Sequence, residues 1–386
     1  MHLHRHCSQY LQLLLKSKSC FLKKKSTLYL GIGCFFLLPE IEMTQTEKIA
    51  SMTIEKNITD LFRAHCSKPL SITKIQGDAS SRQYFRVTGT HGTSIACYDP
   101  AFEASTPDNY PFLLLHNLLS RHAIPVPALI GVNALNGLLL LEDCGDLLLQ
   151  NLFGSSLEYT VPDRYREIID ILIQVQGIHD HKNIIPFSIS FDHEKIMFEF
   201  DFFITHALLN YFSPAFDRQS VGKLRHEFEA ITEILVKPQH FVLNHRDFHS
   251  RNILIHHEKP MIIDFQDARM GLPQYDAVSL IRDSYVKLSP ALTEELKLYH
   301  FNALCDYELT TMSLDEYLFY FDIMAFQRNI KAIGTFCYQT SVKHNSTFEH
   351  SIAPTLNYLP DYINARTELK TAGNILHTLL EGAVAR

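Results

Sequence analysis

One stretch of the chain, residues 245–266, contains side chains suited to moving a phosphoryl group. It reads His-Arg-Asp-Phe-His-Ser-Arg-Asn, then two short apolar runs, then Asp-Phe-Gln. Phosphoryl transfer requires that phosphate charge be neutralised while an acceptor oxygen is held in line. Asp247 is the candidate carboxylate for the acceptor, as its proton acceptor or its orienting group. Asn252 and Asp264 are candidate oxygen ligands for Mg²⁺, which prefers a few protein oxygens.

The spacing of these residues supports a common role. One loop can direct Asp247 towards an acceptor and Asn252 towards a metal. The apolar runs Ile253–Ile255 and Met261–Ile263 flank a polar segment and predict a hairpin, which would return Asp264 to the side of Asn252. A lone His-x-Asp is common in polar loops. The carboxylate, the metal pair and the hairpin together favour kinase-like chemistry.

A turn rich in small residues lies upstream, between the predicted strands Ser71–Gln76 and Gln83–Thr88. Such a turn can cover phosphates with backbone N–H groups, hydroxyls and a cation. Arg82 and Arg86 are four residues apart, which places both on one face of a strand. The same pattern also fits a plain turn followed by a solvated strand. The candidate phosphate-binding residues are Gly77, Ser80, Ser81, Arg82 and Arg86.

Further elements must position these groups. A third strand is predicted at Ser94–Tyr98 and a buried one at Leu138–Leu141. The acidic turn after the latter strand suits a hinge whose backbone pairs with an adenine edge, and Glu142 and Cys144 are its candidate residues. Strand Phe241–Asn244 leads into the motif at 245. Helices are predicted at Ile58–Cys66, Phe112–His122, Pro162–His179, Phe198–Tyr211 and Gly222–Leu235.

The remainder of the chain is predicted to be mainly helical. Asp276 is expected to cap a helix that begins at Ala277, and the aromatic run Phe198–Phe203 is expected to be core. Arg328 and Lys331 are three residues apart on one helix face. These two basic side chains either face solvent or bind an acidic substrate.

The 386 residues are enough for two domains. We expect an N-terminal domain over residues 43–145 and a helical domain over residues 146–386. Residues 1–42 differ in composition, and their apolar run Tyr29–Leu38 is shorter than the roughly twenty residues that span a bilayer. We interpret them as an over-extended start, with the working chain beginning at Met43 or Met52. A segment in weak contact with a membrane is the alternative.

Composition limits the compartment and the partners. The net charge of -7 gives no basic surface for nucleic acid. The eight cysteines include no C-x-x-C pair and suit reduced thiols of a cytoplasmic protein. We expect a cytoplasmic monomer that acts on a small molecule, with no nucleic-acid partner and no stable membrane association.

The motifs resemble those of the aminoglycoside phosphotransferase and choline kinase relatives of the protein kinases. The similarity rests on residues 77–86, 245–252, 264–268, 275–283 and 327–331, and it is strongest to the bacterial anomeric kinases of N-acetylmuramate and N-acetylglucosamine. It implies an α+β, protein-kinase-like, two-lobed fold, with a small antiparallel-sheet N-lobe and a mainly helical C-lobe. The cofactors that it implies are ATP and Mg²⁺.

The resemblance also implies roles for individual residues. Asp247 corresponds to the acceptor carboxylate, and Asn252 and Asp264 to the magnesium ligands. Asp276 corresponds to a residue that braces the catalytic loop, and His245 would pack beneath the Asp264–Phe265 turn. The sequence departs from the kinase pattern at one point. Its strand at residues 95–99 has no lysine where kinases have the lysine that binds phosphate. The anomeric kinases share this lack, so that Arg82 or Arg86 becomes the expected replacement.

The activity implied by the resemblance is transfer of the ATP γ-phosphoryl group to the anomeric hydroxyl of an N-acetylated amino sugar. The product would be a sugar 1-phosphate for peptidoglycan recycling. Arg328 and Lys331 would then contact the lactyl carboxylate of N-acetylmuramate. Three alternatives remain: an aminoglycoside kinase, a choline- or homoserine-type metabolite kinase, and a degenerate kinase that acts as a binding module.

Overall fold

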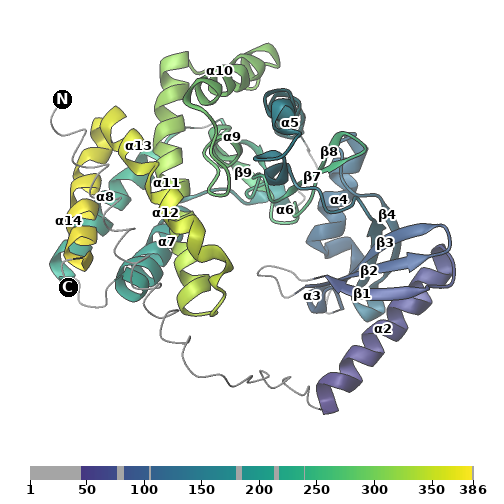
Figure 1. Ribbon diagram of the computed structural model, residues 1–386. Helices are drawn as coiled ribbons and strands as arrows, with labels where there is room; N and C mark the ends of the chain where they lie inside the picture. The colour runs from purple at the N-terminus through teal and green to yellow at the C-terminus, as the bar shows by residue number, and fades with distance from the viewer. Residues whose placement is uncertain are drawn as a thin grey trace. The chain divides into compact units, whose positions relative to one another are not determined.

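The computed structural model describes residues 45–75, 82–103, 106–179, 185–212, 217–238 and 240–384, which fall into two compact units (Figure 1). The sheet unit contains the described residues up to Leu147 together with Leu254–Gln266. The helical unit contains Leu148–Ile253 and the chain from Asp267 onward. Within these ranges, no helix has the length and apolar character that crossing a membrane requires. The predicted extension at 1–42 lies outside the described residues.

The sheet unit is built on a five-stranded antiparallel sheet in the order β1-β2-β3-β5-β4. Inward and outward residues alternate along β2, as period-two geometry requires. The three strands predicted upstream and the apolar strand at 138 are confirmed. The bounds are β1 Ser71–Ile75, β2 Gln83–Gly89, β3 Gly92–Tyr98, β4 Leu129–Asn133 and β5 Leu138–Glu142.

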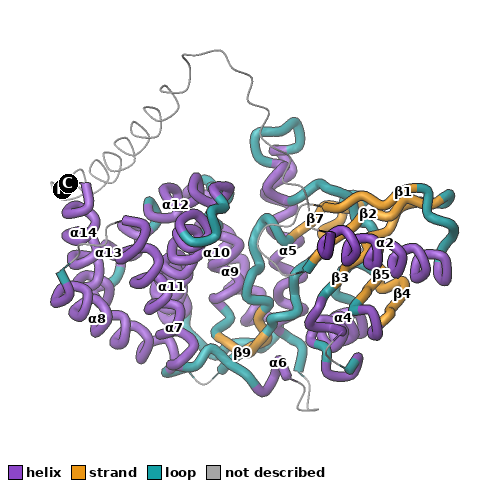
Figure 2. Tube along the Cα trace, turned by 90° about the horizontal axis from the view of Figure 1, so that it is seen from below, coloured by secondary structure: helices purple, strands orange, loops and turns teal. Residues whose placement is uncertain are grey.

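Helix α2 (Gln45–His65) covers one face of this sheet (Figure 2). Its residues Ile58, Leu61 and Phe62 pack against Phe85, Val87, Ala96, Leu138 and Leu140. The helix starts well before the predicted Ile58, because only its C-terminal half has the apolar spacing that periodicity detects. Helix α4 (Pro111–Arg121) matches the prediction, and a short helix α3 (Pro100–Glu103) precedes it.

Strand β4 was not predicted. Among the described strands it lies at the sheet edge and pairs with β5, and its register shifts between Leu129 and Gly131. A glycine within a strand weakens the period-two signal. The predicted hairpin is present as β7 (Ile253–His256) and β8 (Lys259–Ile262). Hydrogen bonds from Ile255 N–H to the Leu147 carbonyl (2.7 Å) and from Ile262 N–H to the Pro125 carbonyl (2.8 Å) attach it to the sheet unit.

The helical unit is organised around the long helix α11 (Leu314–Ser341), which contacts α7, α8, α9, α10, α12 and α13. Figure 1 shows α11 running through the middle of these helices. A two-stranded sheet of β6 (Val242–Asn244) and β9 (Arg269–Gly271) accompanies them. The remaining helices are α5 Val161–Gln176, α6 Ile185–Ser188, α7 His193–Phe203, α8 Arg218–Val236, α9 Gln274–Ile281, α10 Pro290–Asp306, α12 Glu349–Leu356, α13 Leu359–Ala365 and α14 Lys370–Val384.

Two local predictions in this unit are wrong. Helix α9 begins at Gln274, so that Asp276 lies inside it instead of capping it, and its carboxylate contacts another segment. In the aromatic run at 198–203, Phe200 and Phe203 are buried but Phe198 is 58% exposed. A helix has one buried face, so consecutive aromatic residues cannot all be core. After Phe203 the chain continues as a π-helix over Ile204–Phe212.

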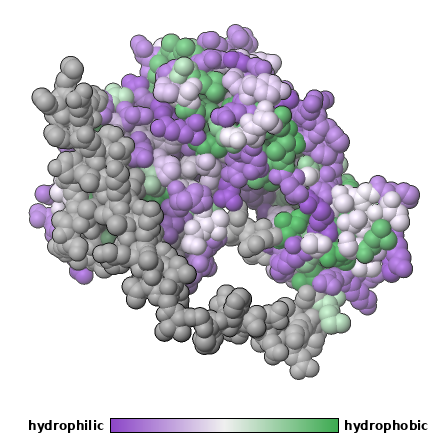
Figure 3. Space-filling view, in the orientation of Figure 1, coloured by the Kyte–Doolittle hydropathy of each residue, from purple (hydrophilic) through white to green (hydrophobic). Residues whose placement is uncertain are grey.

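The surface mixes polar and apolar side chains, as is usual for folded domains. Figure 3 shows hydrophilic and apolar residues side by side over the visible face. Two of the exposed apolar residues, Leu135 at 88% and Tyr159 at 79%, lie in separate short 3-10 helices.

Gly334 allows α11 to approach the end of α7 closely. A Cβ at this position would lie 2.9 Å from Cα and 3.1 Å from the backbone N of Phe203. Backbone atoms cannot move aside as a flexible side chain can, so Gly334→Ala should lower the free energy of unfolding by about 1–3 kcal/mol. Urea unfolding followed by circular dichroism measures this change.

Gly222→Ala is the matched control, because it makes the same substitution inside α8 where nothing lies within 4 Å of the added Cβ. It should raise the free energy of unfolding by about 0.5–1 kcal/mol, since alanine restricts the unfolded chain and favours the helix. Equal effects of the two substitutions would refute the close contact.

Candidate active site

Residues 245–252 form a loop that follows the buried strand β6, and a carboxylate from α9 holds its first turn. The Asp276 side chain is fully buried and accepts hydrogen bonds from the N–H groups of His245 (2.5 Å) and Arg246 (3.0 Å). Arg246 has a φ of +83°, a conformation that costs energy for a residue with a Cβ. The two hydrogen bonds stabilise this backbone, which is the geometry that the predicted bracing role of Asp276 requires.

A second buried carboxylate holds the other end of the loop. Asp283, just after α9, accepts a hydrogen bond from the Ser250 N–H at 2.8 Å. Within the loop, the Asp247 carbonyl accepts from the N–H of His249 (3.0 Å) and from the side-chain amide of Asn252 (2.9 Å). The backbone that carries Asp247 and Asn252 is therefore fixed at several points.

His245 is buried within the helical unit. Its ring contacts Phe248 with the ring centroids 5.6 Å apart, and its Nδ1 accepts a long hydrogen bond from the Asp247 N–H at 3.3 Å. These contacts agree with a structural role. Its predicted position beneath Asp264–Phe265 involves residues of both units and stays a prediction.

The Asp247 carboxylate lies beside two cations from α11. Lys331 Nζ is 3.3 Å and Arg328 Nη2 is 3.9 Å from Asp247 Oδ1, and the Asp247 side chain remains 34% exposed. Burial alone would raise the pKa of Asp247, but the charges of Lys331 and Arg328 outweigh it and hold that pKa well below its usual range. Asp247 is consequently an anion at neutral pH and a weak base.

Arg328 and Lys331 do not form a solvated helix face. Arg328 is 7% exposed, and the Lys331 side chain is 16% exposed. Arg328 Nε donates to Ser279 Oγ at 2.8 Å, and its guanidinium lies over the Tyr275 ring, 5.1 Å from the centroid. The alternative of an exposed basic face is therefore wrong. The predicted contact with a substrate carboxylate stays a prediction.

In the sheet unit, Asp264 has a φ of +66°, in the left-handed region that Asp adopts more readily than most residues. Phe265 is buried against Phe112 of α4, with the ring centroids 5.0 Å apart, and this packing anchors the turn. Gln266 Nε2 donates to Asp264 Oδ1 at 2.8 Å. The Asp264 carboxylate and the Asn252 amide offer the oxygen donors that suit Mg²⁺. They belong to different units, so their shared binding of a metal stays a prediction.

The two candidate arginines have different environments. Arg82 Nε is 2.8 Å from Asp99 Oδ2, and its Nη1 is 4.0 Å from Asp264 Oδ1. Arg86 pairs with both Asp143 (2.7 Å) and Asp146 (2.8 Å) of the turn after β5. Arg82 also precedes β2 instead of sharing a strand face with Arg86. These contacts favour Arg82 as the cation nearer the predicted metal ligand. Gly77, Ser80 and Ser81 lie outside the described residues.

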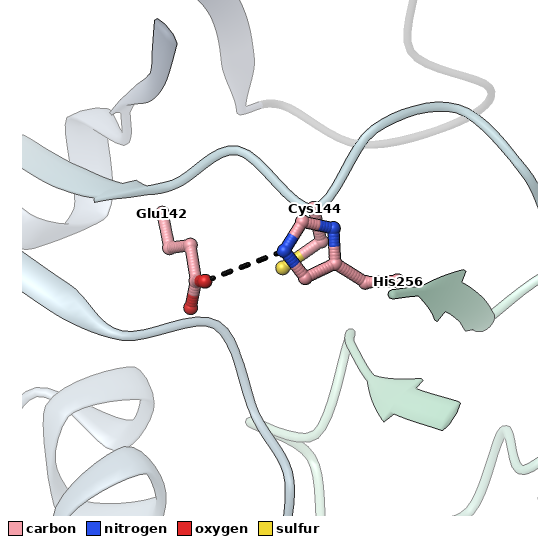
Figure 4. A group of neighbouring side chains, drawn as sticks. All are labelled: Glu142, Cys144 and His256. Carbon is pink, nitrogen blue, oxygen red and sulfur yellow. Dashed lines mark ion pairs between the residues drawn. The ribbon is translucent and has the colours of Figure 1, made fainter. Parts of the chain in front are cut away.

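The hinge candidates Glu142 and Cys144 lie beside His256 of β7 (Figure 4). The potential ligand atoms of these three residues all lie within 4.8 Å of one another. Glu142 Oε1 is 3.6 Å from His256 Nε2, and Glu142 Oε2 accepts from the Ala128 N–H at 3.0 Å. Burial and the neighbouring carboxylates raise the pKa of the Cys144 thiol to about 12, so it is neutral. The ion pair and hydrogen bond account for the placement of Glu142 and His256.

Several residues that shape this site were not singled out from the sequence as charged partners. Glu199 of α7 is 3% exposed and its charge acts on Lys331. Asp99 pairs with Arg82. Asp143 and Asp146 were seen only as part of an acidic turn. Ion-pair partners far apart in sequence leave no local pattern. Asp283 belongs to the segment 275–283 on which the family resemblance rests.

Comparison with known proteins shows which family and which sequences this chain resembles. The model of the phosphotransferase enzyme family matches residues 71–307. An N-acetylmuramate/N-acetylglucosamine kinase of Pseudomonas aeruginosa is 25% identical over 82% of this chain and 91% of its own length. A kinase of the same name from Neisseria meningitidis is 26% identical over 76% of this chain and 85% of its own length.

Solved structures confirm the fold class. A Plasmodium vivax ethanolamine kinase superposes with a TM-score of 0.57 at 14% identity, covering 83% of this chain and 89% of its own. A choline kinase of Cryptosporidium parvum gives 0.53 at 14% identity, covering 88% and 100%. An ADP-bound aminoglycoside phosphotransferase gives 0.50 at 13% identity, covering 80% and 96%. The α+β, protein-kinase-like fold predicted from the motifs is therefore confirmed.

Removal of the Asp276 carboxylate should destabilise the helical unit. Asp276→Ala leaves two N–H groups of the buried loop without an acceptor, which should cost about 2 kcal/mol or more in the free energy of unfolding. Chemical denaturation measures the loss, and hydrogen exchange should show faster exchange at His245 and Arg246.

Asp217→Ala provides the control, because Asp217 also accepts from two backbone N–H groups, those of Gln219 and Ser220, but at an exposed helix start. Water can replace the lost acceptor there, so the loss of stability should be clearly smaller than for Asp276→Ala. A smaller effect at Asp276 than at Asp217 would contradict the bracing role.

Proposed function

Because the chain belongs to the phosphotransferase enzyme family, we propose that it is an ATP-dependent kinase of N-acetylmuramate and N-acetylglucosamine that phosphorylates the anomeric hydroxyl. The observation that carries the acceptor class is the agreement in length and sequence with curated kinases of these two sugars. The product, a sugar 1-phosphate, would enter peptidoglycan recycling in the cytoplasm.

The proposed step joins the acceptor oxygen to the γ-phosphorus of ATP. The bond between that phosphorus and the bridging oxygen breaks, its electron pair stays on ADP, and the hydroxyl proton leaves through Asp247 to solvent. An anomeric hydroxyl is more acidic than an ordinary alcohol, and a loose transition state requires little prior deprotonation. The lowered pKa of Asp247 suits this demand, since the carboxylate needs to orient the hydroxyl more than to remove its proton.

Other residues would bind the nucleotide and metal. Asn252 and Asp264 are the proposed Mg²⁺ ligands, and bound Mg²⁺ would neutralise phosphate charge. Arg82 is the proposed phosphate cation, because its Nη1 lies 4.0 Å from the proposed metal ligand Asp264, whereas Arg86 pairs with Asp143 and Asp146 of the turn after β5. Gly77, Ser80 and Ser81 are proposed to cover the phosphates, and the turn containing Glu142 and Cys144 to contact the adenine.

An ATP-consumption screen over N-acetylated amino sugars, aminoglycosides and choline tests the acceptor class. We expect turnover with N-acetylmuramate and N-acetylglucosamine, and phosphorus NMR should place the phosphate on the anomeric oxygen. Asp247→Asn should lower turnover by about 100-fold or more while ATP binding survives. Turnover with only an aminoglycoside or choline would refute the sugar assignment. ATP binding without turnover of any acceptor would favour a binding module.

Substitution of Arg82 and substitution of Arg86 should have different effects on the KM for ATP and on turnover. Arg82→Gln should raise the KM for ATP or lower turnover by about 10-fold or more, because it removes a charge beside the proposed metal ligand. Arg86→Gln removes a cation paired with Asp143 and Asp146, and should mainly lower thermal stability. It is the matched control for charge and size. A larger kinetic defect in Arg86→Gln than in Arg82→Gln would reverse the assignment.

A further inference from the structure

Lys331 is the cation nearest to Asp247 among the described residues of the helical unit. Its Nζ lies 3.3 Å from Asp247 Oδ1 and 3.4 Å from the Tyr275 hydroxyl. Its side chain is 16% exposed, and its helix α11 is the central element of the unit. A lysine with this burial has little freedom to follow a flexible ligand, so its ammonium group has a defined position relative to the carboxylate.

A second carboxylate, that of Glu199, acts on Lys331 from helix α7. Glu199 of α7 is 3% exposed and accepts from Gln327 Nε2 at 2.8 Å, while Lys195 Nζ lies 3.5 Å from it. The charge of Lys331 is a main reason why the pKa of Glu199 is lowered despite burial. Burial lowers the pKa of Lys331, while Asp247 and Glu199 oppose that shift. Lys331 thus has carboxylate charge near it from two elements.

Arg328 is held differently and cannot exchange roles with Lys331. Its Nε donates to Ser279 Oγ and its guanidinium covers the Tyr275 ring, so its position is set by the helix α9 that also carries Asp276. Its nearest nitrogen is 3.9 Å from Asp247, beyond hydrogen-bond distance. Lys331 is the closer partner, and Arg328 adds charge from further away.

We propose, on the basis of the proposed function, that Lys331 is a positioning residue that aims the Asp247 carboxylate at the acceptor hydroxyl, and that it does not read the substrate carboxylate. One oxygen of Asp247 is held by Lys331, which leaves the other to accept from the hydroxyl. The same ammonium group balances the negative charge of Asp247 when an anionic phosphoryl group approaches. A lysine 84 residues after Asp247 in the chain would thereby supply positive charge to a kinase that lacks a lysine in β3.

Turnover with the two sugars distinguishes the two roles of Lys331. Lys331→Met keeps the length of the side chain but removes its charge. If Lys331 positions Asp247, kcat should fall by about 100-fold with both sugars, while both sugar KM values and the KM for ATP change little. Lys331→Arg, which keeps the charge, should recover part of kcat. A rise in KM for N-acetylmuramate alone, with kcat kept, would instead show that Lys331 reads the carboxylate and would overturn the proposal.

Lys297→Met is the matched control, because Lys297 is also buried, at 6% exposure, and also pairs with a carboxylate, Glu294, at 2.8 Å. Lys297→Met should leave kcat within about twofold of wild type. This control shows whether a fall in kcat comes from the lost contact with Asp247 or from the removal of any buried lysine. An equal fall in kcat for Lys297→Met and Lys331→Met would overturn the proposal. If Lys331→Met does not fold, as judged by thermal unfolding, Lys331→Gln replaces it with the same expected outcomes.

The test also separates this inference from the proposed acceptor. The variants are compared with whichever acceptor the wild-type chain phosphorylates. If the wild type used only choline or an aminoglycoside, the sugar assignment would fail, yet the fall in kcat at constant KM would still report on Lys331 and Asp247. If the wild type phosphorylates the sugars and Lys331→Met retains wild-type kcat, the positioning role alone fails.

Discussion

The loop that carries Asp247 is partly buried, and three of its backbone N–H groups take acceptors from outside the loop. Asp276 and Asp283, on either side of the end of helix α9, provide them at His245, Arg246 and Ser250. An unpaired buried N–H group costs free energy comparable to a lost hydrogen bond. Asp276 of α9 therefore stabilises the strained backbone at Arg246, the residue that precedes Asp247.

Charge around Asp247 follows from the packing of α11. Burial of a lone carboxylate would raise its pKa and favour the neutral acid. Lys331 and Arg328 reverse this, and the carboxylate stays ionised while remaining partly open to solvent. The site therefore combines a permanent negative charge for orientation with nearby positive charge. This combination suits transfer of an anionic group to a hydroxyl that needs little activation.

The sheet unit has no lysine in β3 and contains two arginines that pair with carboxylates. Arg82, just before β2, and Arg86, within β2, each pair with carboxylates of the same unit. Arg86 and the turn after β5 form a closed ion-pair group, whereas Arg82 extends from Asp99 towards Asp264. Arginine suits such shared positions, because its planar group presents several donors at once.

The candidate catalytic motif, the hairpin that follows it, most strands of the sheet and the kinase-like class could be predicted from the sequence, because these depend on short-range spacing and period. The sequence could not show that α9 begins early enough to place Asp276 inside it, that β4 forms an edge, or that Phe198 faces solvent. It also left two alternatives open for Arg328 and Lys331, namely a solvated helix face or a contact with an acidic substrate. The positions of the buried Arg328 and the partly buried Lys331 beside Asp247 are visible in the folded structure alone, because burial and ion pairing between α11 and the loop depend on contacts between residues far apart in the chain.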